Sequence, residues 1–567
     1  MTTRTISLII LLVGSGLITV LSCLTSLNRT EVAHLGAASY FWRTGRFDLF
    51  HVNPPMGRMV SGLPIKLLGT EHDLRHYSHR PQDRSEWRIG EDFVRSNAPP
   101  IVRRAYILGR LALLPLLLIG GFFGVRLARE IFGSGADVVF AILWSFSPLC
   151  LSWGATMCPD MAAASLGIVA TYFFRRWVLV STWKNVAWAG IGIGLLPLAK
   201  TTWVIAFGLF PVIWFFSKNR PPWKQLATIL VIAVYVLNMG YGFDGSFQLL
   251  KNFEFISKSL VGTETSDNQK PNRFAGTLLG YLPVPLPAEF VQGIDTQKRD
   301  FEEGLESYLF GKYAGHGWWY YYIVVLLLKE PIGTLLLAIL AIGLILFANT
   351  YRASWNDEIL VLFPFSSLFL ILCVQTGFSL HPRYLLPVLP FFYIFVSRVG
   401  TVFSRPNRVL QVFTSACLIL TIVSSLSIYP YSMSYINELI PLQKRPKILL
   451  GSNLDWGQDA WFLKSWLQHH PEAKPIRIAY PCPEEIERIG IETEGVPPTM
   501  PEPGWYAIGL NDLYSSTKRF EWLLETKPVA CVGYSIYIYH ISLDEANRIR
   551  GEYDDEPFDT INEGEHP

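Results

Sequence analysis

Four charged side chains stand at the edges of long apolar runs. Glu31 follows the first run by a few residues, and Asp160 stands at the start of another. Lys200 lies between two apolar runs, and Arg383 comes just before one. Carboxylates can transfer protons, a lysine can hold a phosphate as a point charge, and an arginine can bind it through two parallel hydrogen bonds. An anionic lipid headgroup would account for both cations.

Each of these residues also has a structural interpretation. Glu31 could be an acidic residue that complements the dipole at a helix N-terminus. Asp160 follows a proline, which is an ordinary signal for a helix start, although ionisable groups at membrane depth are costly and usually functional. Lys200 could extend its ammonium group to the membrane interface.

Aromatic residues form a second candidate site in His316-Gly317-Trp318-Trp319, which a run of tyrosines follows. Aromatic side chains commonly gather at membrane interfaces. They can also provide a stacking surface for a sugar or a lipid headgroup. Both interpretations of His316, Trp318 and Trp319 stay open from the sequence.

The elements that must position these residues are membrane-spanning helices. Half of the 567 residues are hydrophobic and only 17% are charged, whereas soluble domains carry about 25% charged residues. A spanning helix needs about 20 mostly apolar residues. Eleven candidate spans follow, at about 6–26, 106–126, 137–153, 159–175, 186–200, 202–217, 225–241, 331–349, 358–376, 384–398 and 409–428.

The distribution of Lys and Arg predicts the orientation. With a cytoplasmic N-terminus, the short inside loops carry Lys and Arg, whereas the short outside turns carry almost none, with Lys200 and Arg383 as the exceptions; this is the distribution that the positive-inside rule requires. An odd number of spans then places residues 429–567 outside, together with the long polar segments 27–105 and 242–330. The first run is too long to favour the alternative of a cleaved signal peptide.

Charge divides the chain into two predicted domains. Residues 429–567 hold 12 Lys+Arg and 22 Asp+Glu, whereas residues 1–428 hold 36 and 24. We therefore expect a membrane domain at 1–428 and a small acidic α/β domain at 429–567, with strands near 475–480, 504–510 and 529–541 and helices near 457–469, 516–526 and 542–550. In the first outer segment we expect a helix on the membrane surface that ends at Gly45, and a second at about 56–68.

The outside segments resemble the GT-C glycosyltransferases, and more narrowly the family that includes protein O-mannosyltransferases and the lipid A aminoarabinose transferase (glycosyltransferase family 39-like, bacterial type). The resemblance runs through most of the membrane domain. Its motifs are Glu31 and His34, a loose match from Phe41 to Gly45, Asn-Pro-Pro at 53–55, Asp160, Lys200, Gly-Trp-Trp-Tyr at 317–320, Arg-Tyr-Leu-Leu-Pro at 383–387, and Ser-Asn-Leu-Asp-Trp-Gly-Gln-Asp at 452–459.

The resemblance implies a GT-C fold and an inverting transfer, on the outer face, from a polyprenyl phosphate sugar to a hydroxyl. These families carry an acidic pair after the first span, whereas this chain has Thr30-Glu31. We therefore expect Glu31 to be the general base, with Asp160 orienting the acceptor or sharing that role. Lys200 and Arg383 would stabilise the phosphate leaving group.

Further contacts to donor or acceptor are expected from His34, His51, Asn53, His316, Trp318 and Trp319. The scheme requires no cofactor and no metal. The expected partners are the polyprenyl phosphate sugar (undecaprenyl or dolichyl), membrane lipid, and an acceptor that is protein, glycolipid or polysaccharide. A net charge of +2 gives no reason to expect nucleic acid.

The expected location is the plasma (inner) membrane, with an extracytoplasmic C-terminal domain. Two other functions stay open. The first is a transporter or flippase for a lipid-linked sugar, although the inverted repeats typical of transporters are not evident in the sequence. The second is an inactive scaffold of the same fold, for which the missing aspartate at position 30 is the main argument.

Overall fold

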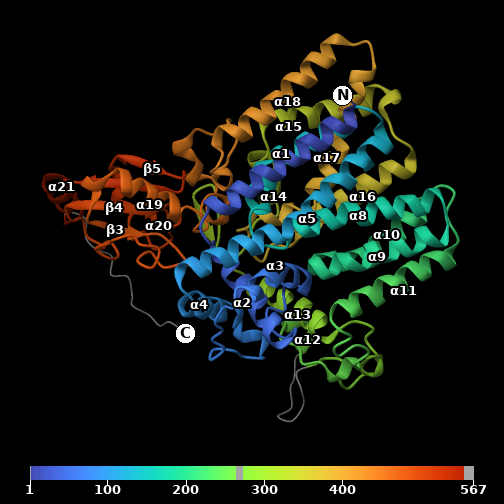
Figure 1. Ribbon diagram of the computed structural model, residues 1–567, viewed down its shortest axis with the longest axis horizontal. Coiled ribbons are helices and arrows are strands. Elements are labelled where there is room, and N and C mark those ends of the chain that lie inside the picture. Colours follow the sequence, from blue (N-terminus) through green and yellow to red (C-terminus); the bar gives the residue numbers. More distant parts are fainter. Residues whose placement is uncertain (1, 263–271, 555–567) are drawn as a thin grey trace.

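The computed structural model describes residues 2–262 and 272–554 and consists mainly of helices (Figure 1). Parts of the predicted second outer segment (263–271) and of the C-terminal domain (555–567) lie outside the described residues. The helices before residue 242 are α1 (Thr3–Leu24), α2 (Arg29–Thr44), α3 (Pro55–Leu67), α4 (Glu86–Ser96), α5 (Pro99–Phe132), α6 (Ala136–Phe146), α7 (Pro148–Gly154), α8 (Asp160–Leu179), α9 (Trp183–Ala199), α10 (Ala206–Phe216) and α11 (Trp223–Gly240).

The second half of the chain adds further helices and two sheets. Its helices are α12 (Lys258–Val261), α13 (Ala288–Glu303), α14 (Tyr321–Lys329), α15 (Ile332–Phe347), α16 (Trp355–Val374), α17 (Leu389–Ser397), α18 (Arg408–Ile428), α19 (Ala460–His469), α20 (Leu510–Leu513) and α21 (Leu543–Asp554). The strands are β1 (Ser307–Leu309), β2 (Lys312–Ala314), β3 (Ile476–Ala479), β4 (Gly504–Gly509), β5 (Ala530–Val532) and β6 (Ile536–Ile541).

Five helices are long and apolar enough to cross a membrane: α1, α5, α11, α16 and α18. The number rises to seven if the bent pairs α6–α7 and α14–α15 each form one span. The chain is thus an integral membrane protein by the length and composition of its helices. Every predicted span coincides with helix, but the predicted number of eleven is not confirmed, because helices such as α9, α10 and α17 are short.

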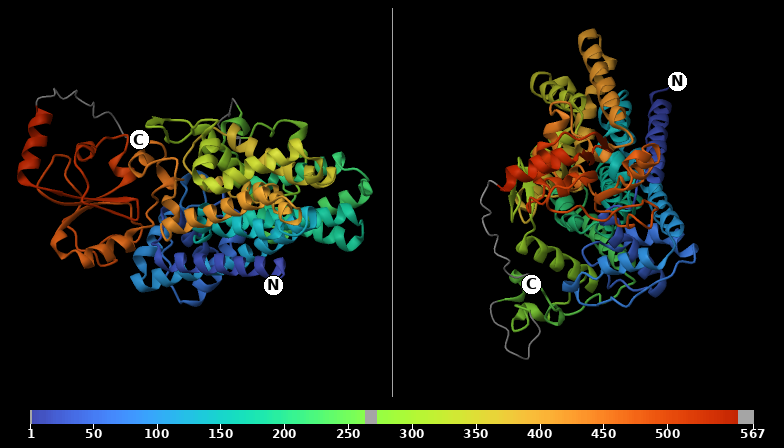
Figure 2. Two further views of the ribbon diagram at one scale, coloured as in Figure 1. Left: turned by 90° about the horizontal axis from the view of Figure 1, so that it is seen from above. Right: turned by 90° about the vertical axis from the view of Figure 1, so that its left-hand side faces the viewer.

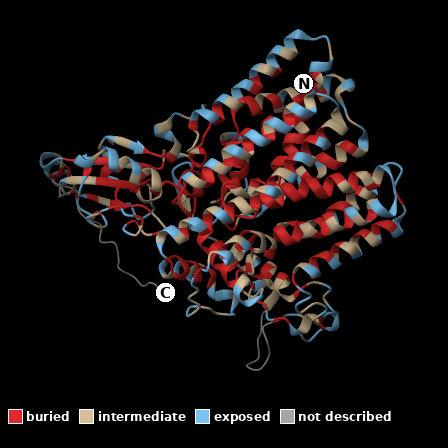
Figure 3. Cartoon of the chain, viewed as in Figure 1, coloured by how far each residue is buried: buried red, intermediate tan, exposed pale blue. Residues whose placement is uncertain are grey.

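Buried residues fill the middle of the bundle (Figure 3), and the exposed residues on the outer faces of these helices include many large apolar ones. Val231 on α11 is 68% exposed, Leu370 on α16 is 62% exposed and Ile419 on α18 is 61% exposed. Large apolar patches are rare on soluble monomers. A lipid environment removes the cost of exposing them, and this distribution is therefore the one expected of a bundle surrounded by acyl chains.

Both bent pairs break beside a proline, and the two breaks are in contact. The α14–α15 pair bends by 110° and the α6–α7 pair by 56°. Ser147, between α6 and α7, donates to Glu330 Oε1 over 3.2 Å, and the Tyr393 hydroxyl donates to the same oxygen over 2.8 Å. A broken helix exposes backbone groups that must find other partners.

The chain beyond α18 supplies those partners. Asn437 donates to the carbonyls of Leu327 and Glu330 at the end of α14. Buried Lys329 donates through Nζ to the carbonyls of Met433, Tyr435 and Asn453, over 2.6–2.8 Å. The segment after residue 428 is therefore part of the support of the membrane helices. The domain boundary between 428 and 429 stays a prediction.

In the predicted first outer segment, the two expected helices form with nearly the predicted bounds, but the first is more enclosed than expected. Helix α2 ends at Gly45, which adopts a left-handed conformation with φ 71°, and α3 covers the second predicted helix. The expected surface helix is instead buried at every residue from 30 to 40. Glycines allow this, because a Cβ on Gly36 would lie 2.6 Å from the backbone nitrogen of Gly90 in α4.

The C-terminal part contains a four-stranded sheet of order β3-β4-β6-β5. Strands β3 and β4 are parallel, and the other neighbours are antiparallel. Side chains alternate between the two faces: Ile536 and Ile538 pack in the cluster with α19, whereas Tyr539 and Ile541 pack in the cluster with α21. Figure 2 shows this sheet beside the helical bundle.

All three predicted strand runs contain strands, the last one both β5 and β6. The expected helices at 457–469 and 542–550 correspond to α19 and α21. The one expected at 516–526 is wrong in type, because only a short 3-10 helix, Glu521–Glu525, forms there.

Candidate active site

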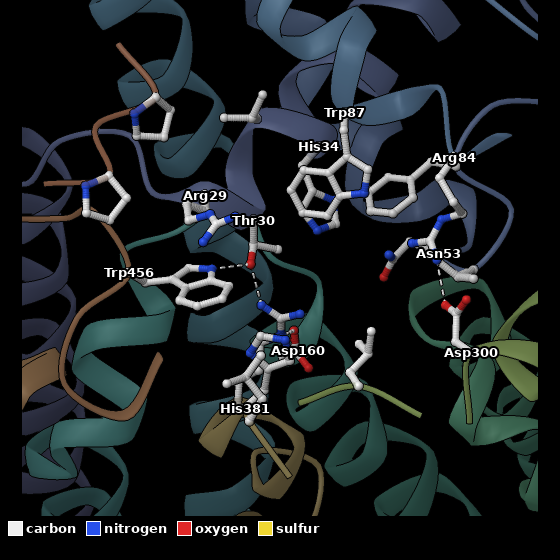
Figure 4. A pocket seen from close by; sticks show the side chains of 18 of the residues that line it. Arg29, Thr30, His34, Asn53, Arg84, Trp87, Asp160, Asp300, His381 and Trp456 are labelled. Carbon is white, nitrogen blue, oxygen red and sulfur yellow. Dashed lines mark hydrogen bonds and ion pairs between the residues drawn. The ribbon is translucent and has the colours of Figure 1, made fainter. Parts of the chain in front are cut away.

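A cavity of about 740 Å³ lies where the three long polar segments meet the membrane helices. Figure 4 shows Thr30, Asp160 and His381 near its centre, with Trp456 on one side and Asp300 on the other. Its lining comes from α2, the α2–α3 loop, α4 and the residue Arg84 before it, the start of α8, the end of α9, α13, the 378–384 segment and two C-terminal loops. Its polar and charged residues are Arg29, Thr30, His34, Asn53, Arg84, Glu91, Arg95, Asp160, Lys200, Thr201, Gln297, Asp300, His381, Arg383, Tyr384 and Glu485.

Three charged side chains converge on one wall of the cavity. Asp160 is the first residue of α8, Lys200 caps the C-terminus of α9, and Arg383 lies in the 3-10 helix Pro382–Leu385. Lys200 Nζ donates to Asp160 Oδ1, and Arg383 Nε lies 3.6 Å from Asp160 Oδ2. One carboxylate thus serves two cations, and the cluster keeps a positive charge that an anion can neutralise.

Aromatic rings hold the two cations in place. Lys200 Nζ lies 4.5 Å from the ring centroid of Tyr384, and the Arg383 guanidinium lies 5.3 Å from that of Trp153 and 5.4 Å from that of Tyr384. Such contacts stabilise a desolvated cation by about 2 kcal/mol. The cations therefore keep their positions without a second carboxylate.

The Thr30 hydroxyl connects this cluster to the C-terminal part of the chain. Its oxygen accepts from Arg383 Nη1 over 2.7 Å and from Trp456 Nε1 over 2.8 Å. Beside it, the Arg29 guanidinium lies 5.3 Å from the ring centroid of Trp456. Backbone bonds fix this junction, because Arg29 N donates to the Trp456 carbonyl and Ser26 N to the Gln458 carbonyl, both over 3.0 Å.

Two neutral histidines complete the centre of the cavity. Burial, followed by the charge of Arg383, lowers the pKa of His34 to about 3. The same two causes hold the pKa of His381 well below its usual value, and its Nδ1 lies 2.8 Å from Ser452 Oγ. Both rings are therefore uncharged at neutral pH and add no cation to the cluster.

The other side of the cavity carries a second ion pair. Arg84 Nη1 donates to Asp300 Oδ2 over 2.6 Å, and Arg84 Nε donates to Glu86 over 2.7 Å. Burial raises the pKa of Asp300 above its usual value. Asn53 lines this side as well.

Glu31 does not line the cavity. This position argues against the predicted role of Glu31 as the general base. Its side chain is fully buried and forms two bonds with Arg110, from Nε over 2.8 Å and from Nη2 over 2.6 Å. The backbone N–H groups of Met157 and Asn28 donate to it over 2.8 and 3.2 Å. Both oxygens are therefore engaged in joining α2, α5 and the loop before α8.

The other predicted contact residues separate into two groups. His34 and Asn53 line the cavity. His51 lies outside the lining, with Nδ1 2.7 Å from Glu289 Oε2. His316 and Trp319 are exposed and Trp318 packs against the core, all beyond the cavity wall. Among residues 2–262 and 272–554, no group of three or more His, Cys, Asp or Glu side chains is arranged to hold a metal ion.

Several residues of the cavity were not assigned from the sequence, among them Arg29, Arg84, Asp300 and His381. His381 adjoins the Arg383 motif, and that position was an available signal. Arg84 and Asp300 lie in different polar segments, and only the tertiary fold brings them together. Trp456 belongs to the quoted tail motif, but nothing in that motif places it beside Thr30.

Comparisons with known proteins give structural likenesses alone. No protein-family model matches the chain, and no curated protein is similar to it. The chain is similar in structure to glycosyltransferases of the GT-C fold. A crystal structure of ArnT from Cupriavidus metallidurans bound to undecaprenyl phosphate covers 94% of this chain and 97% of its own, at 11% identity and a TM-score of 0.46.

A second likeness is to the Archaeoglobus fulgidus oligosaccharyltransferase in complex with zinc and sulfate. It covers 88% of this chain and 68% of that chain, at 11% identity and a TM-score of 0.40. These are enzymes of the class that the sequence resembles. Because both TM-scores lie below 0.5, no activity of this chain follows from the likeness.

Proposed function

We propose that the protein is a glycosyltransferase that moves a sugar from a polyprenyl phosphate to a hydroxyl acceptor. The observation that carries the proposal is the wall of the cavity at which Lys200 and Arg383 share one carboxylate, Asp160. This wall has an excess of positive charge beside apolar helices, which is what a phosphate on a lipid chain requires. Positioned cations are the usual means of stabilising a phosphate as it leaves.

The reaction is a single displacement. The acceptor oxygen forms a bond to the anomeric carbon while the bond from that carbon to the phosphate oxygen breaks, which inverts the anomeric centre. The polyprenyl phosphate leaves with the bonding electron pair, and Lys200 and Arg383 hold its charge. The acceptor proton passes to a carboxylate that lines the cavity.

Asp160 is the carboxylate that we assign to this proton. Glu31, the base expected from the sequence, has both oxygens bonded within a fully buried cluster. Two neighbouring cations, Lys200 and Arg383, engage the oxygens of Asp160 in the unliganded cavity. A phosphate that takes over bonds from Lys200 and Arg383 releases the carboxylate, so that donor binding prepares the base.

The experiment is sugar transfer in membranes with a panel of labelled polyprenyl phosphate sugars and several hydroxyl acceptors. We expect a labelled product from the wild type and at least about a hundredfold less from Asp160→Asn. Unchanged product from Asp160→Asn, with loss in Asp300→Asn, would move the base to Asp300. Absence of product from folded wild type with every donor would overturn the proposed function.

A further inference from the structure

The Thr30 oxygen has an unusual set of partners. It receives hydrogen bonds from a charged donor, Arg383 Nη1, and from Trp456 Nε1, at 2.7 and 2.8 Å. A hydroxyl oxygen has two lone pairs and one hydrogen. Both lone pairs are therefore used, and the hydroxyl hydrogen is the group that Thr30 has left to offer.

That hydrogen has no acceptor in the part of the chain that the structure describes. A threonine in a helix can donate to the carbonyl four residues earlier. Here that carbonyl belongs to Ser26, which lies before the helix begins and accepts from Arg110 Nη2 over 2.8 Å. Thr30 lines the cavity, at the centre of the view in Figure 4. Its hydroxyl is therefore a donor facing the cavity.

The surroundings select for a negatively charged acceptor. Hydrogen bonds from Arg383 and Trp456 polarise the hydroxyl, and chains of hydrogen bonds strengthen one another. Arg29 follows the same wall, stacked on Trp456, and no carboxylate forms an ion pair with it among residues 2–262 and 272–554. Two guanidinium groups, an indole N–H and a hydroxyl thus meet at one place.

We propose that Thr30 donates to a non-bridging phosphate oxygen of the lipid-linked donor and that Trp456 positions it. The C-terminal part of the chain then contributes to the phosphate site through Trp456. The identity of the anion rests on the proposed function, whereas the donor role of Thr30 rests on its two bonds and its place on the cavity wall. Thr30 is a binding residue, and Trp456 acts through it.

This role differs from that of a carboxylate at the same position. An aspartate would accept a proton, and it would compete with a phosphate for Arg383. A threonine hydroxyl stays protonated and adds to the attraction. The substitution Thr30→Asp therefore distinguishes a proton acceptor from a phosphate-binding donor at this position. It should speed transfer in the first case and weaken donor binding in the second.

The test is binding of polyprenyl phosphate to the purified full-length protein in lipid nanodiscs, with Thr30→Val, Thr30→Ser, Thr30→Asp and Trp456→Phe. A hydrogen bond to a charged group contributes about 1.5–3 kcal/mol, so we expect Thr30→Val to weaken binding about tenfold or more. Thr30→Ser keeps the hydroxyl and should bind within about twofold of the wild type. Thr30→Asp should bind more weakly than Thr30→Val, because like charges repel.

Trp456→Phe keeps an aromatic ring for Arg29 and removes the N–H donor. It should weaken binding less than Thr30→Val and add little in the double variant, because the two residues act as a unit. The effect should appear in the KM for the donor, with the KM for the acceptor unchanged. Thermal unfolding of each variant identifies any variant that fails to fold. If Thr30→Val fails to fold, Thr30→Ser and Trp456→Phe still test the proposal.

The outcomes separate this inference from the proposed function. Equal binding by the wild type, Thr30→Val and Trp456→Phe overturns the inference alone. Faster transfer by Thr30→Asp overturns it too, because it shows the position to be that of a base. Binding of inorganic phosphate as tightly as polyprenyl phosphate overturns the lipid as the source of the anion. If the wild type binds no polyprenyl phosphate, the inference and the proposed donor fall together.

Discussion

Two carboxylates lie close to Thr30, one beside it in the chain and the other through Arg383, and they stand in opposite situations. Glu31 has one guanidinium partner and two backbone donors, which engage both of its oxygens in a fully buried cluster. Asp160 shares its charge between Lys200 and Arg383 on the wall of a cavity. The first cluster is complete without a ligand, whereas the second has a cation in excess.

The difference shows how a structural ion pair can be told from a chemical one. Glu31 joins three elements, because Arg110 also donates to the carbonyls of Ser22, Thr25 and Ser26 at the end of α1. Asp160 gathers cations that have further N–H groups to offer. Equal burial does not distinguish the two sites. The distinguishing property is whether the charges around each carboxylate are balanced.

Exchange of each carboxylate for its amide should separate activity from stability. Asp160→Asn should lower transfer by about 10²- to 10⁴-fold, the usual contribution of a general base. Glu31→Gln should keep transfer within about threefold per folded molecule, because its carboxylate lies off the cavity. The measurement is the initial transfer rate divided by the amount of folded protein. A loss with Glu31→Gln that matches Asp160→Asn would show that the comparison is wrong.

Truncation of Glu31 should have the largest effect on stability. Glu31→Ala leaves Arg110 buried without its counter-ion, and such breakage costs about 3–5 kcal/mol. The double variant Glu31→Ala/Arg110→Met should recover part of that loss, because no buried charge remains unpaired. Thermal unfolding in detergent at a fixed scan rate gives the comparison. Equal unfolding temperatures for the wild type and Glu31→Ala would contradict the structural role.

A conservative change at Arg383 tests the cluster of Asp160, Lys200 and Arg383, because it alters the geometry of the cation and keeps its charge. Arg383→Lys keeps the cation but cannot reach Asp160 and Thr30 together, because lysine lacks the planar fork. Loss of one bond to a charged group predicts donor binding weaker by about 10- to 100-fold. Titration with polyprenyl phosphate measures it, and Arg175→Lys, distant from the cavity in a pair with Asp357, is the matched control. Equal losses in both variants would count against a phosphate site.

The smallest expected effect is a loss of stability at low pH from His34. Its folded-state pKa is about 3, below the unfolded value of about 6.5. Between these values the unfolded chain binds a proton that the folded chain does not, so stability falls as pH falls below about 6.5. From pH 6.5 to 5 the loss is about 1.6 kcal/mol, because the unfolded histidine is already half protonated at pH 6.5.

The pH test compares unfolding temperatures of the wild type and His34→Asn across that range. We expect the wild type to lose more on acidification, and His381 adds a common slope to both, because its pKa is lowered too. Identical slopes would show that the pKa of His34 is not lowered in the folded protein.

Much of the fold could be predicted from the sequence because its signals are local. The apolar runs, the stop at Gly45 and the alternation in the C-terminal strands each depend on neighbours along the chain. The number of spans was less accessible, since helices such as α10 and α17 are too short to count by length alone. The burial of α2 was also out of reach, because it depends on α4 approaching at Gly36 and Gly90.

The candidate site was predictable where residue type and position agree. Asp160, Lys200 and Arg383 lie together on one wall of the cavity, and His34 and Asn53 line the same cavity; the binding of a phosphate there stays a prediction. Glu31 is a carboxylate close to the cavity, as a general base would be, but it forms a buried ion pair with Arg110 of α5. No local pattern shows that pairing, because 79 residues separate the two.

The hydrogen bonds of Lys329 have a consequence for the order in which the protein is synthesised and folds. Its three carbonyl partners lie at residues 433, 435 and 453, and these are synthesised after the helices on either side of the break. Translation proceeds at about 5–20 residues per second. Lys329 at the bend is therefore without these three partners for several seconds after it is synthesised. The final packing of α14 and α15 thus depends on a segment that is synthesised later. In the predicted orientation, that segment must also cross the membrane before it can bind Lys329.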